Sequence, residues 1–431
     1  MNNFFKGTIT DISDVNPVQP LPRGVIVKKI PMEYVQTFNR KIIGYDKSEY
    51  KSGPKFKNGD TLLAKITPCL ENGKTAFVDI LDDTEVAFGS SEFIVLRPKK
   101  SSDEKFLYYF AISPLFRKRA ISSMEGTSGR KRVNEITLKN YDFTLPIIEE
   151  RKKIGDSLSL IDEKIEINNK INANLEQLAQ TIYHYWFIQF EFPDKNGKPY
   201  KSSGGKMVWN EALKRKIPEG WKALSLTSLI AESKNGDWGS ESISEGSTRC
   251  FCIRGADING LNGIENFSPP VRYIDKSHRN RQLKADDLII EISGGSPAQS
   301  TGRMAHISHD VLARLNNTVV CSNFCKAISL KQTKLSYIVS RYWARLYDSN
   351  IFFNHEGKTS GIKNLLFDQL SKDVKIALPK DENLIDEYYE FEENIDKQKQ
   401  NNLVQNEELA KLRDWLLPML MNGQLKVGEE K

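Results

Sequence analysis

Two loops in different halves of the chain are rich in residue types that bind phosphate groups. The loops consist of Gly126, Thr127, Ser128, Gly129, Arg130, Lys131 and Arg132, and of Lys358, Thr359, Ser360, Gly361 and Lys363. Small residues expose backbone N–H groups, and hydroxyl groups and cations bind phosphate oxygens. One such loop could be an ordinary solvated turn. Because the pattern occurs twice, it favours an anionic ligand.

A second set of polar side chains is suited to hydrogen bonds with base edges. Arginine, lysine, glutamine and asparagine are the residues that pair with bases in the major groove of DNA. The set consists of Asn72, Lys74, Arg254, Ser296, Gln299, Thr301 and Arg303. We therefore expect these loops to contact double-stranded DNA. Binding should weaken as salt rises, because each phosphate contact releases counterions.

The chain lacks the motifs of common nucleotide-dependent enzymes. It has no phosphate-binding loop ending in Gly-Lys-Ser or Gly-Lys-Thr, no glycine fingerprint for a dinucleotide, and no Asn/Asp-Pro-Pro-Tyr tetrapeptide of amino-methyltransferases. The cysteines Cys250, Cys252, Cys321 and Cys325 could supply four thiolates to zinc, but their spacing is not that of the usual knuckle. Free cysteines are also commonly buried. We predict no catalytic residue, no metal and no cofactor in this chain.

The composition indicates a folded protein with a mildly positive charge. The 431 residues include 62 Lys and Arg and 56 Asp and Glu, a formal net charge of +6, and 39% are hydrophobic. No apolar run reaches the roughly 20 residues of a membrane helix, and the first residues do not resemble a secretory signal. Five cysteines do not make a disulfide scaffold in so long a chain. We expect a cytoplasmic protein without a membrane partner.

The two halves of the chain are similar in sequence. KNGDTLLAKI at 57–66 corresponds to LKADDLIIEI at 283–292, and EGTSGRKR at 125–132 corresponds to EGKTSGIK at 356–363. Ser91-Glu92-Phe93 likewise corresponds to Ser322-Asn323-Phe324. Several matches in the same order predict two copies of one module. Each copy combines β-branched runs typical of strands with amphipathic runs typical of helices.

Each module is followed by a long run with apolar residues at heptad spacing and polar amides in the middle. The predicted seam consists of Ile154, Leu158, Ile161, Ile165, Asn168, Asn172, Leu175, Ile182, Phe391, Ile395, Asn402, Leu409, Leu412 and Leu416. A helix of roughly 55 Å is longer than its own module could cover, so we predict that the two helices pair. Because the first leads to module two and the second starts where module two ends, they should be antiparallel.

These patterns divide the chain into six segments. They are a first module at 1–147, a first long helix at 148–190, a linker at 191–217, a second module at 218–380, a second long helix at 381–423 and a tail at 424–431. The predicted fold class is α+β. It contains two pseudo-two-fold-related α/β modules separated by two long antiparallel, coiled-coil-like helices.

These features together resemble the specificity (S) subunit of type I restriction-modification systems. The most specific segments are IDEKI at 161–165, YWF at 185–187, GKPYKSSGGKM at 197–207, IPEGW at 217–221 and WLLPMLMNG at 415–423. The resemblance implies two target-recognition domains that read a bipartite, asymmetric DNA target. It implies two modification subunits, which bring S-adenosylmethionine and methylate adenine N6. It also implies two restriction subunits, which bring ATP and magnesium for translocation and cleavage, while the S subunit performs no chemistry.

Two other functions fit the sequence. One is a stand-alone DNA-binding or regulatory protein of the same fold, which a neighbouring gene for an adenine methyltransferase would argue against. The other is an antiparallel coiled-coil scaffold whose end domains bind proteins. Failure of the purified complex to retain any duplex from a random pool would favour the scaffold.

Overall fold

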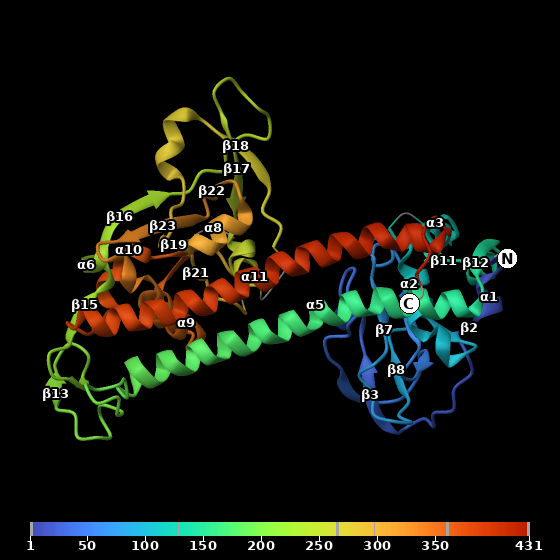
Figure 1. Ribbon diagram of the computed structural model, residues 1–431, viewed down its shortest axis with the longest axis horizontal. Coiled ribbons are helices and arrows are strands. Elements are labelled where there is room, and N and C mark those ends of the chain that lie inside the picture. The colour runs from blue at the N-terminus through green and yellow to red at the C-terminus, as the bar shows by residue number, and fades with distance from the viewer. Residues whose placement is uncertain (1–2, 128, 264–266, 297, 359–361, 429–431) are drawn as a thin grey trace. The chain divides into compact units, whose positions relative to one another are not determined.

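The computed structural model describes residues 3–127, 129–263, 267–296, 298–358 and 362–428 (Figure 1). The chain forms two compact units: residues 1–166 and 406–431 make up unit 1, and residues 167–405 make up unit 2. Each unit therefore contains a globular module and part of both long helices. The division into six segments stays a prediction. Over the described ranges, no helix is long and apolar enough to cross a membrane.

Unit 1 is built on two four-stranded sheets. The first, in the order β2-β9-β6-β7, is antiparallel throughout; in the second, in the order β4-β3-β8-β5, β3 and β8 are parallel. The strands are β1 (Phe4–Gly7), β2 (Ser13–Val15), β3 (Ile26–Ile30), β4 (Asp46–Glu49), β5 (Lys55–Phe56), β6 (Thr61–Ala64), β7 (Thr75–Phe77), β8 (Ala87–Gly89), β9 (Phe93–Pro98), β10 (Met124–Glu125), β11 (Arg132–Val133) and β12 (Phe143–Pro146).

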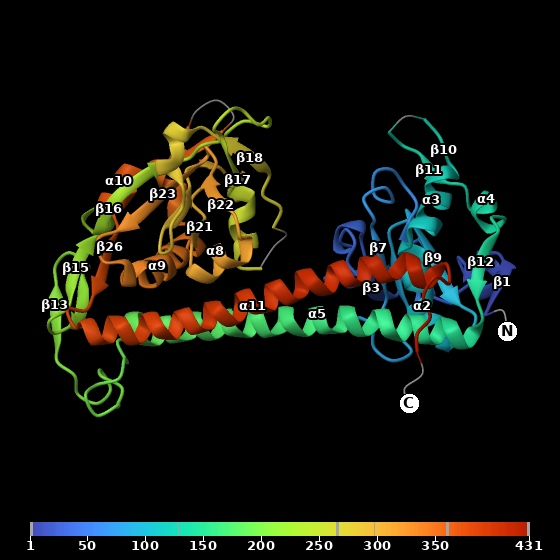
Figure 2. The ribbon, with the colours of Figure 1, turned by 45° about the horizontal axis from the view of Figure 1, so that its top comes forward.

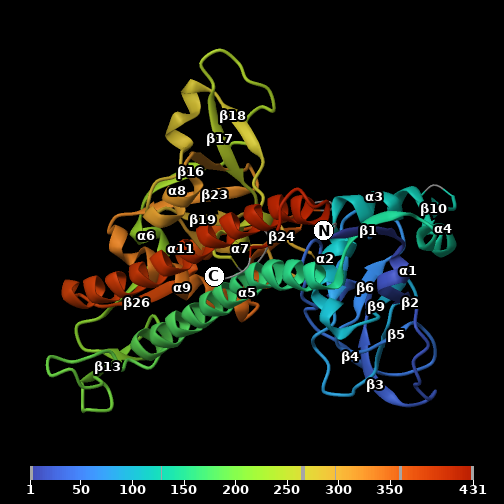
Figure 3. The same ribbon diagram turned by 45° about the vertical axis from the view of Figure 1, so that its right-hand side comes forward.

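Of the helices in unit 1, α1 and α2 pack on the first sheet, and α3 and α4 pack on those two helices. These helices are α1 (Ile9–Ile12), α2 (Glu104–Ile112), α3 (Pro114–Ser122) and α4 (Glu135–Lys139), with a 3-10 turn, η1, at Met32–Tyr34. Phe106 and Leu107 of α2 pack with Leu63 of β6 and Ile94 of β9 in the main core. Every residue of β6 is buried, as expected for an apolar strand covered on both faces. Figure 3 shows α3, β10 and α4 side by side at one edge of this unit.

Unit 2 contains a four-stranded antiparallel sheet, in the order β16-β23-β19-β21, and a three-stranded sheet, β18-β17-β22, in which β17 and β22 are parallel. The strands are β13 (Met207–Asn210), β14 (Arg215–Pro218), β15 (Lys222–Ser225), β16 (Ile230–Asn235), β17 (Thr248–Ile253), β18 (Val271–Ile274), β19 (Leu288–Glu291), β20 (Ser293–Gly294), β21 (Met304–His306), β22 (Thr318–Cys321), β23 (Cys325–Leu330), β24 (Glu356–Lys358), β25 (Lys363–Leu365) and β26 (Lys375–Leu378). The main helices are α6 (Leu226–Leu229), α7 (Ile258–Leu261), α8 (His309–Leu315), α9 (Ser336–Asp348) and α10 (Phe367–Asp373).

The main sheets of the two modules have the same topology, which confirms the predicted duplication. The order β2-β9-β6-β7 in unit 1 corresponds strand for strand to β16-β23-β19-β21 in unit 2. The pairing of β1 with β12 corresponds to that of β15 with β26. Asp60 and Asp287 even cap equivalent turns, accepting from Lys57 N at 2.9 Å and from Lys284 N at 2.8 Å.

Two parts of the sequence alignment between the modules are wrong by one residue. The equivalence of Asp60 with Asp287 matches residues 57–66 to 284–293 and not to 283–292. The second error concerns Phe324. Lys65 N donates to Glu92 O at 2.8 Å, whereas the corresponding Ile292 N donates to Phe324 O at 2.8 Å. Phe324 therefore occupies the position of Glu92, not that of Phe93. A one-residue shift along a strand places a side chain on the opposite face. Accordingly, Phe93 is buried and Phe324 is 52% exposed.

The long helices are α5 (Ile148–Tyr183), which ends in a π-helical turn, and α11 (Glu382–Met421) (Figure 2). They run antiparallel within each unit: Asp162 pairs with Arg413 in unit 1, and Asn172 contacts Asn402 in unit 2. Gly155 allows α5 to lie close to α2, because a Cβ there would lie 2.6 Å from the backbone nitrogen of Phe106.

Most of the predicted seam is buried or half-buried. The exception is Leu412, which is 45% exposed and does not belong to the seam. An α-helix has 3.6 residues per turn, so a strict heptad pattern drifts by roughly 20° per heptad. At this end of the helix pair, the neighbouring Arg413 faces α5 instead.

Candidate nucleic-acid interface

In unit 1, two loops that are distant in sequence lie against each other. The hairpin β10–β11 presents residues 126–127 and 129–131 between its strands, and a turn at 65–74 follows β6. Thr67 N donates to Lys131 O at 3.0 Å, and Val133 N donates to Lys65 O at 2.8 Å. The structure therefore brings the phosphate-type loop and the Asn72–Lys74 turn together. We call residues 65–74 and 124–133 the unit 1 loop cluster.

Two cations of this cluster are available to a ligand. The side chains of Arg130 and Lys131 are exposed, and neither forms an ion pair with any residue that the structure describes. Gly126 and Gly129 have φ values of 124° and 82°, in the region that favours glycine. The two glycines thus allow the loop to turn sharply and to present both cations to solvent.

Arg132 and Lys74, by contrast, are held within the cluster. Arg132 donates to both carboxylate oxygens of Glu92, at 2.9 and 2.7 Å, and this hydrogen bond lowers the pKa of Glu92. Lys74 Nζ donates to the carbonyl of Met32 at 3.0 Å. Both side chains were predicted as DNA contacts, but their present partners are protein groups. They fix the shape of the loops instead of offering a free charge.

Unit 2 has an equivalent arrangement. The small sheet β20-β25-β24 places the loop that begins at Gly294 beside the strands that flank residues 359–361. Leu365 N donates to Ile292 O at 2.9 Å, as Val133 does to Lys65 in unit 1. We call residues 292–303 and 356–365 the unit 2 loop cluster. Within it, Ser296 and Gln299 pair through their backbones and are exposed.

The predicted cations of unit 2 whose side chains are described are paired with carboxylates. Arg303 forms two hydrogen bonds with Glu291, at 3.0 and 2.7 Å, and Lys363 pairs with Glu356 at 2.9 Å. Arg254 lies outside the cluster in sequence and forms two hydrogen bonds with Asp257, at 2.8 and 2.9 Å.

Thr301 is fully buried, and its backbone N–H donates to Glu356 at 2.7 Å. Its prediction as a surface contact is therefore wrong, because the loop folds back over it. Asn72, Thr127 and Gln299 remain exposed. Four predicted positions, Ser128, Thr359, Ser360 and Gly361, lie outside the described residues, and the side chain of Lys358 is likewise not described.

The four buried cysteines of unit 2 behave as small apolar side chains. Burial raises the pKa of Cys250 to about 11 and that of Cys252 to about 12, so both thiols stay protonated near neutral pH. Cys325 is shifted in the same way, to a pKa of about 12. Across the described ranges, no group of three or more His, Cys, Asp and Glu side chains is arranged to hold a metal ion.

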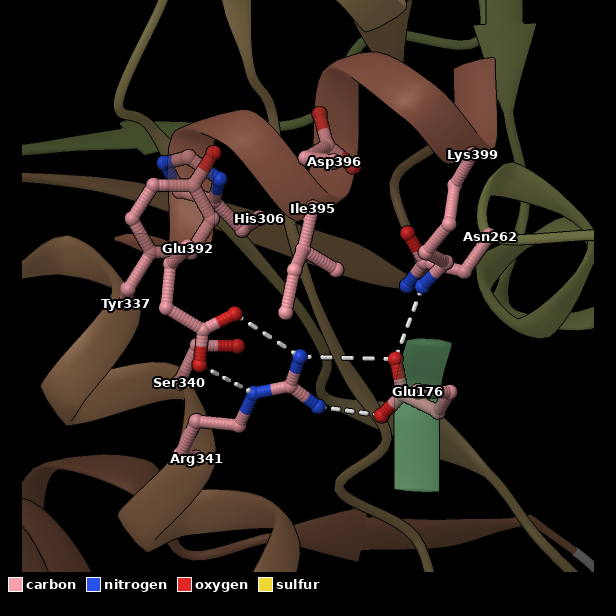
Figure 4. A pocket seen from close by; sticks show the side chains of 10 residues that line it. All are labelled: Glu176, Asn262, His306, Tyr337, Ser340, Arg341, Glu392, Ile395, Asp396 and Lys399. Carbon is pink, nitrogen blue, oxygen red and sulfur yellow. Dashed lines mark hydrogen bonds and ion pairs between the residues drawn. The ribbon is translucent and has the colours of Figure 1, made fainter. Parts of the chain in front are cut away.

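In unit 2 an ionic network fastens the globular module to both long helices (Figure 4). Arg341 of α9 donates to Glu392 of α11 through Nε and Nη2, at 2.9 and 3.0 Å, and also to Glu176 of α5. Lys399 of α11 pairs with Glu176 at 2.7 Å. Burial favours the neutral form of Glu176, but the charges of Arg341 and Lys399 outweigh it and hold its pKa well below the usual range.

Unit 1 uses a smaller network for the same purpose. Asp162 of α5 accepts from the hydroxyl of Tyr109, on α2, at 2.6 Å and from Arg413, on α11, at 2.7 Å. Arg40 and Lys41 also pair with Glu166 of α5, at 3.2 and 3.3 Å. In both units, therefore, buried or half-buried charges fix the loop-bearing module to the helix pair.

Residues 24–177 match the family model of the type I restriction modification DNA specificity domain. The MjaIX specificity subunit of Methanocaldococcus jannaschii is 24% identical over 336 residues, covering 77% of this chain and 71% of that protein. The HindI specificity subunit of Haemophilus influenzae is 31% identical over 180 residues, covering 40% of this chain and 38% of that protein. The chain is thus similar in sequence to specificity subunits of type I restriction enzymes.

The fold is similar to that of a solved type I S subunit. The crystal structure of the S subunit from M. genitalium aligns with a TM-score of 0.53 at 16% identity, covering 99% of this chain and 97% of that one. The resemblance stated from the sequence motifs is confirmed by the family model and the curated relatives. So is the fold class of two related α/β modules with long antiparallel helices.

Sequence reasoning missed two exposed aromatic residues of this chain. Phe38 lies against the unit 1 loop cluster and is 48% exposed, and Phe324 adjoins the unit 2 loop cluster. Phenylalanine alone predicts a core position. The signal that could have identified Phe38 is its setting in TFNRK at 37–41, where no alternation or helical period accounts for an apolar residue.

The chain also exposes apolar residues on its long helices. In unit 2, Ile167, Ile171, Leu178 and Tyr185 are exposed at spacings of four or seven residues, so they share one face of the α5 segment and the turn that follows it. In unit 1, Leu412 and Trp415 are exposed on the α11 segment. Each unit thus presents an uncovered apolar surface on one helix.

Proposed function

We propose that this chain is a type I specificity subunit that binds double-stranded DNA and that each unit recognises one half of a bipartite, asymmetric target. The observation that carries the proposal is the pair of loop clusters at equivalent strand ends of two duplicated modules, in a chain that matches a DNA specificity domain over residues 24–177. Two copies of one module bind two half-sites independently and in a similar way. Because the loop residues of the two modules differ, the base sequences of the two half-sites should differ as well.

The individual residues divide into two roles. Arg130 and Lys131 are exposed and unpaired within the described chain, so they are suited to phosphate contacts. Asn72 and Gln299 are exposed amides, which hydrogen-bond to base edges in the major groove. Arg132, Arg303, Lys363 and Arg254 keep the loops in place through their carboxylate partners.

The proposal assigns the chemistry to partner proteins. The exposed apolar residues on the long helices, one set in each unit, suit two modification subunits, which would bind S-adenosylmethionine and methylate adenine N6. Two restriction subunits would add ATP- and magnesium-dependent translocation and cleavage. The specificity subunit would itself be non-catalytic and would act in the cytoplasm, where genomic DNA is accessible.

The salt dependence of DNA binding tests the phosphate contacts. In the complex with the modification subunits, Arg130→Ala/Lys131→Ala should weaken binding and make the log–log salt slope shallower by roughly 2, because two contacts are lost. The matched control is Lys99→Ala/Lys100→Ala. It removes two exposed cations that follow the carboxyl end of β9, whereas Glu92 of the loop region precedes its amino end. A slope that changes equally in both variants would remove the loop cations from the interface.

The wider function is tested by retention of DNA from a random duplex pool. The complex should select sequences with two short conserved blocks at a fixed spacing. Retention of no preferred sequence would overturn DNA specificity. None of the relatives named above is a stand-alone regulator or a protein-binding scaffold, so neither alternative is proposed.

A further inference from the structure

Phe38 lies at the tip of a loop with an unusual backbone conformation. The loop leaves η1 and is closed by an isolated bridge between Val35 and Ile42. Phe38 has a φ of 50°, a left-handed value that bulky residues rarely adopt. Its ring is nevertheless 48% exposed, so no core packing accounts for the strained backbone. Strained conformations of this kind concentrate at functional sites.

The unit 1 loop cluster holds Phe38 in this position. Phe38 N donates to Gly73 O at 3.2 Å, and a backbone bridge joins Thr37 to Lys74. A Cβ at Gly73 would lie 2.5 Å from the ring of Phe38, so a larger residue there would push the ring out of its present position. The ring therefore lies directly against the turn that carries Asn72 and Lys74.

Charged neighbours hold the loop rigid. Arg117 lies over the ring of Phe38, with its guanidinium carbon 4.6 Å from the ring centroid, and donates to the carbonyl of Glu71 at 2.9 Å. On the other side, Arg40 and Lys41 pair with Glu166 of α5. The ring is thus held in one orientation before any ligand arrives, which lowers the entropy lost on binding.

Among the residues of unit 2 that the structure describes, no equivalent exposed ring lies at this position. Gly302, the counterpart of Gly73, lies against Phe352, which is fully buried. The carbonyl of Gly302 accepts from Trp343 Nε1 at 2.6 Å, whereas that of Gly73 accepts from the backbone of Phe38. The same glycine thus serves core packing in unit 2 and supports a surface ring in unit 1.

We infer that Phe38 stacks on a DNA base as a wedge at one base step of the half-site recognised by unit 1. This inference rests on the proposed function. Apolar side chains inserted between base steps partly unstack them, and aromatic rings stack on any base. Arg117 covers one part of the ring, which leaves the exposed part for the base. The wedge gives unit 1 a means of reading base-step deformability in addition to hydrogen bonding.

The inference is tested by DNA selection with the complex of this chain and its modification subunits. Phe38→Ala and Phe38→Leu remove the aromatic ring, and both should weaken binding roughly 5- to 100-fold. They should also relax base preference at one step in one of the two selected blocks. Phe38→Trp keeps a stacking ring and should retain both the affinity for DNA and the base preference at that step. The control Phe5→Ala removes a Phe that is 38% exposed on β1 of the same unit and should leave selection unchanged.

A fluorescent base reports the contact directly. With 2-aminopurine in place of adenine at the affected step, binding of wild type and Phe38→Trp should change the fluorescence, and binding of Phe38→Leu should not. Unchanged affinity and an unchanged motif for both Phe38→Ala and Phe38→Leu would overturn the wedge while leaving DNA recognition intact. Failure of the wild type to select any motif would overturn DNA recognition and the wedge together.

Discussion

Asn172 of α5 and Asn402 of α11 meet side chain to side chain, with Asn402 Nδ2 donating to Asn172 Oδ1 at 2.8 Å. Asn172 Nδ2 in turn donates to the backbone carbonyl of Lys399 at 3.2 Å. These amides lie where the sequence places polar residues in an otherwise apolar seam. A buried amide pair can be satisfied in one register only, so it fixes how the two helix segments of unit 2 align.

Replacing one member of this pair should lower the free energy of unfolding more than replacing both. Asn172→Leu leaves the Asn402 amide without its acceptor, at a cost of about 1–3 kcal/mol in the free energy of unfolding. Asn172→Leu/Asn402→Leu should recover most of that loss, because two apolar residues can pack together. Urea denaturation of the two single variants and the double variant gives the coupling energy. A coupling near zero would show that the amides do not act as a pair.

The pair of Asp162 and Arg413 should be a major contributor to the stability of unit 1. Arg413→Met leaves Asp162, which is buried, without its cation, and such losses cost roughly 3–5 kcal/mol. The neighbouring Leu412→Ala removes an exposed side chain and should change the unfolding free energy by less than about 1 kcal/mol. If urea denaturation gave equal losses of unfolding free energy for Arg413→Met and Leu412→Ala, that result would contradict a stabilising ion pair between Asp162 and Arg413.

Glu176 should make the stability of unit 2 depend on pH in the acid range. Its pKa is held below the ordinary value of 4.5, so the folded state releases this proton more readily than the unfolded chain. The resulting stabilisation is complete above pH 4.5 and is lost as the pH falls below it. Glu176→Gln should therefore be destabilised relative to wild type at pH 7, with a difference that shrinks on acidification. Glu390→Gln removes one exposed carboxylate from α11 and serves as the control for the loss of one charge.

Glu92 should lower the affinity for DNA. Glu92→Gln weakens the hold on Arg132, which then gains freedom to contact a phosphate. We expect tighter binding at low salt and a log–log salt slope steeper by roughly 1. Glu71→Gln removes one exposed negative charge from the same loop cluster without releasing a cation, so it controls for the change in field. Weaker binding by Glu92→Gln would mean that Arg132 serves DNA only by shaping the loop.

The sequence predicted the duplication, the long helices and their polar centre, because these features depend on local periodicity. Asn168 and Asn172 are buried as the heptad pattern predicts, and Ile154 and Leu158 pack in the core of unit 1. The prediction that Leu412 lies in the seam was wrong, because the helical repeat drifts relative to a seven-residue spacing over such a length. The predicted correspondence of Phe324 with Phe93 was wrong, because alignment by residue type cannot detect a one-residue offset in a strand.

The site was less predictable, because availability of a charge depends on tertiary contacts. Arg132 and Glu92 are 40 residues apart in sequence, and Lys363 pairs with Glu356 only across a hairpin. Spacing in sequence identified the loops but not which cations are neutralised. Phe38 was missed for the opposite reason, since an exposed aromatic residue is recognised only when its surroundings are known.

The core of unit 1 includes Leu417, Leu420 and Met421, which pack with Leu158 from roughly 260 residues earlier in the chain. During synthesis, the amino-terminal module therefore emerges from the ribosome long before its own interior is complete. A nonsense or frameshift mutation after the second module would spare every loop residue discussed here. It would nevertheless leave the first module with an open, water-exposed apolar face.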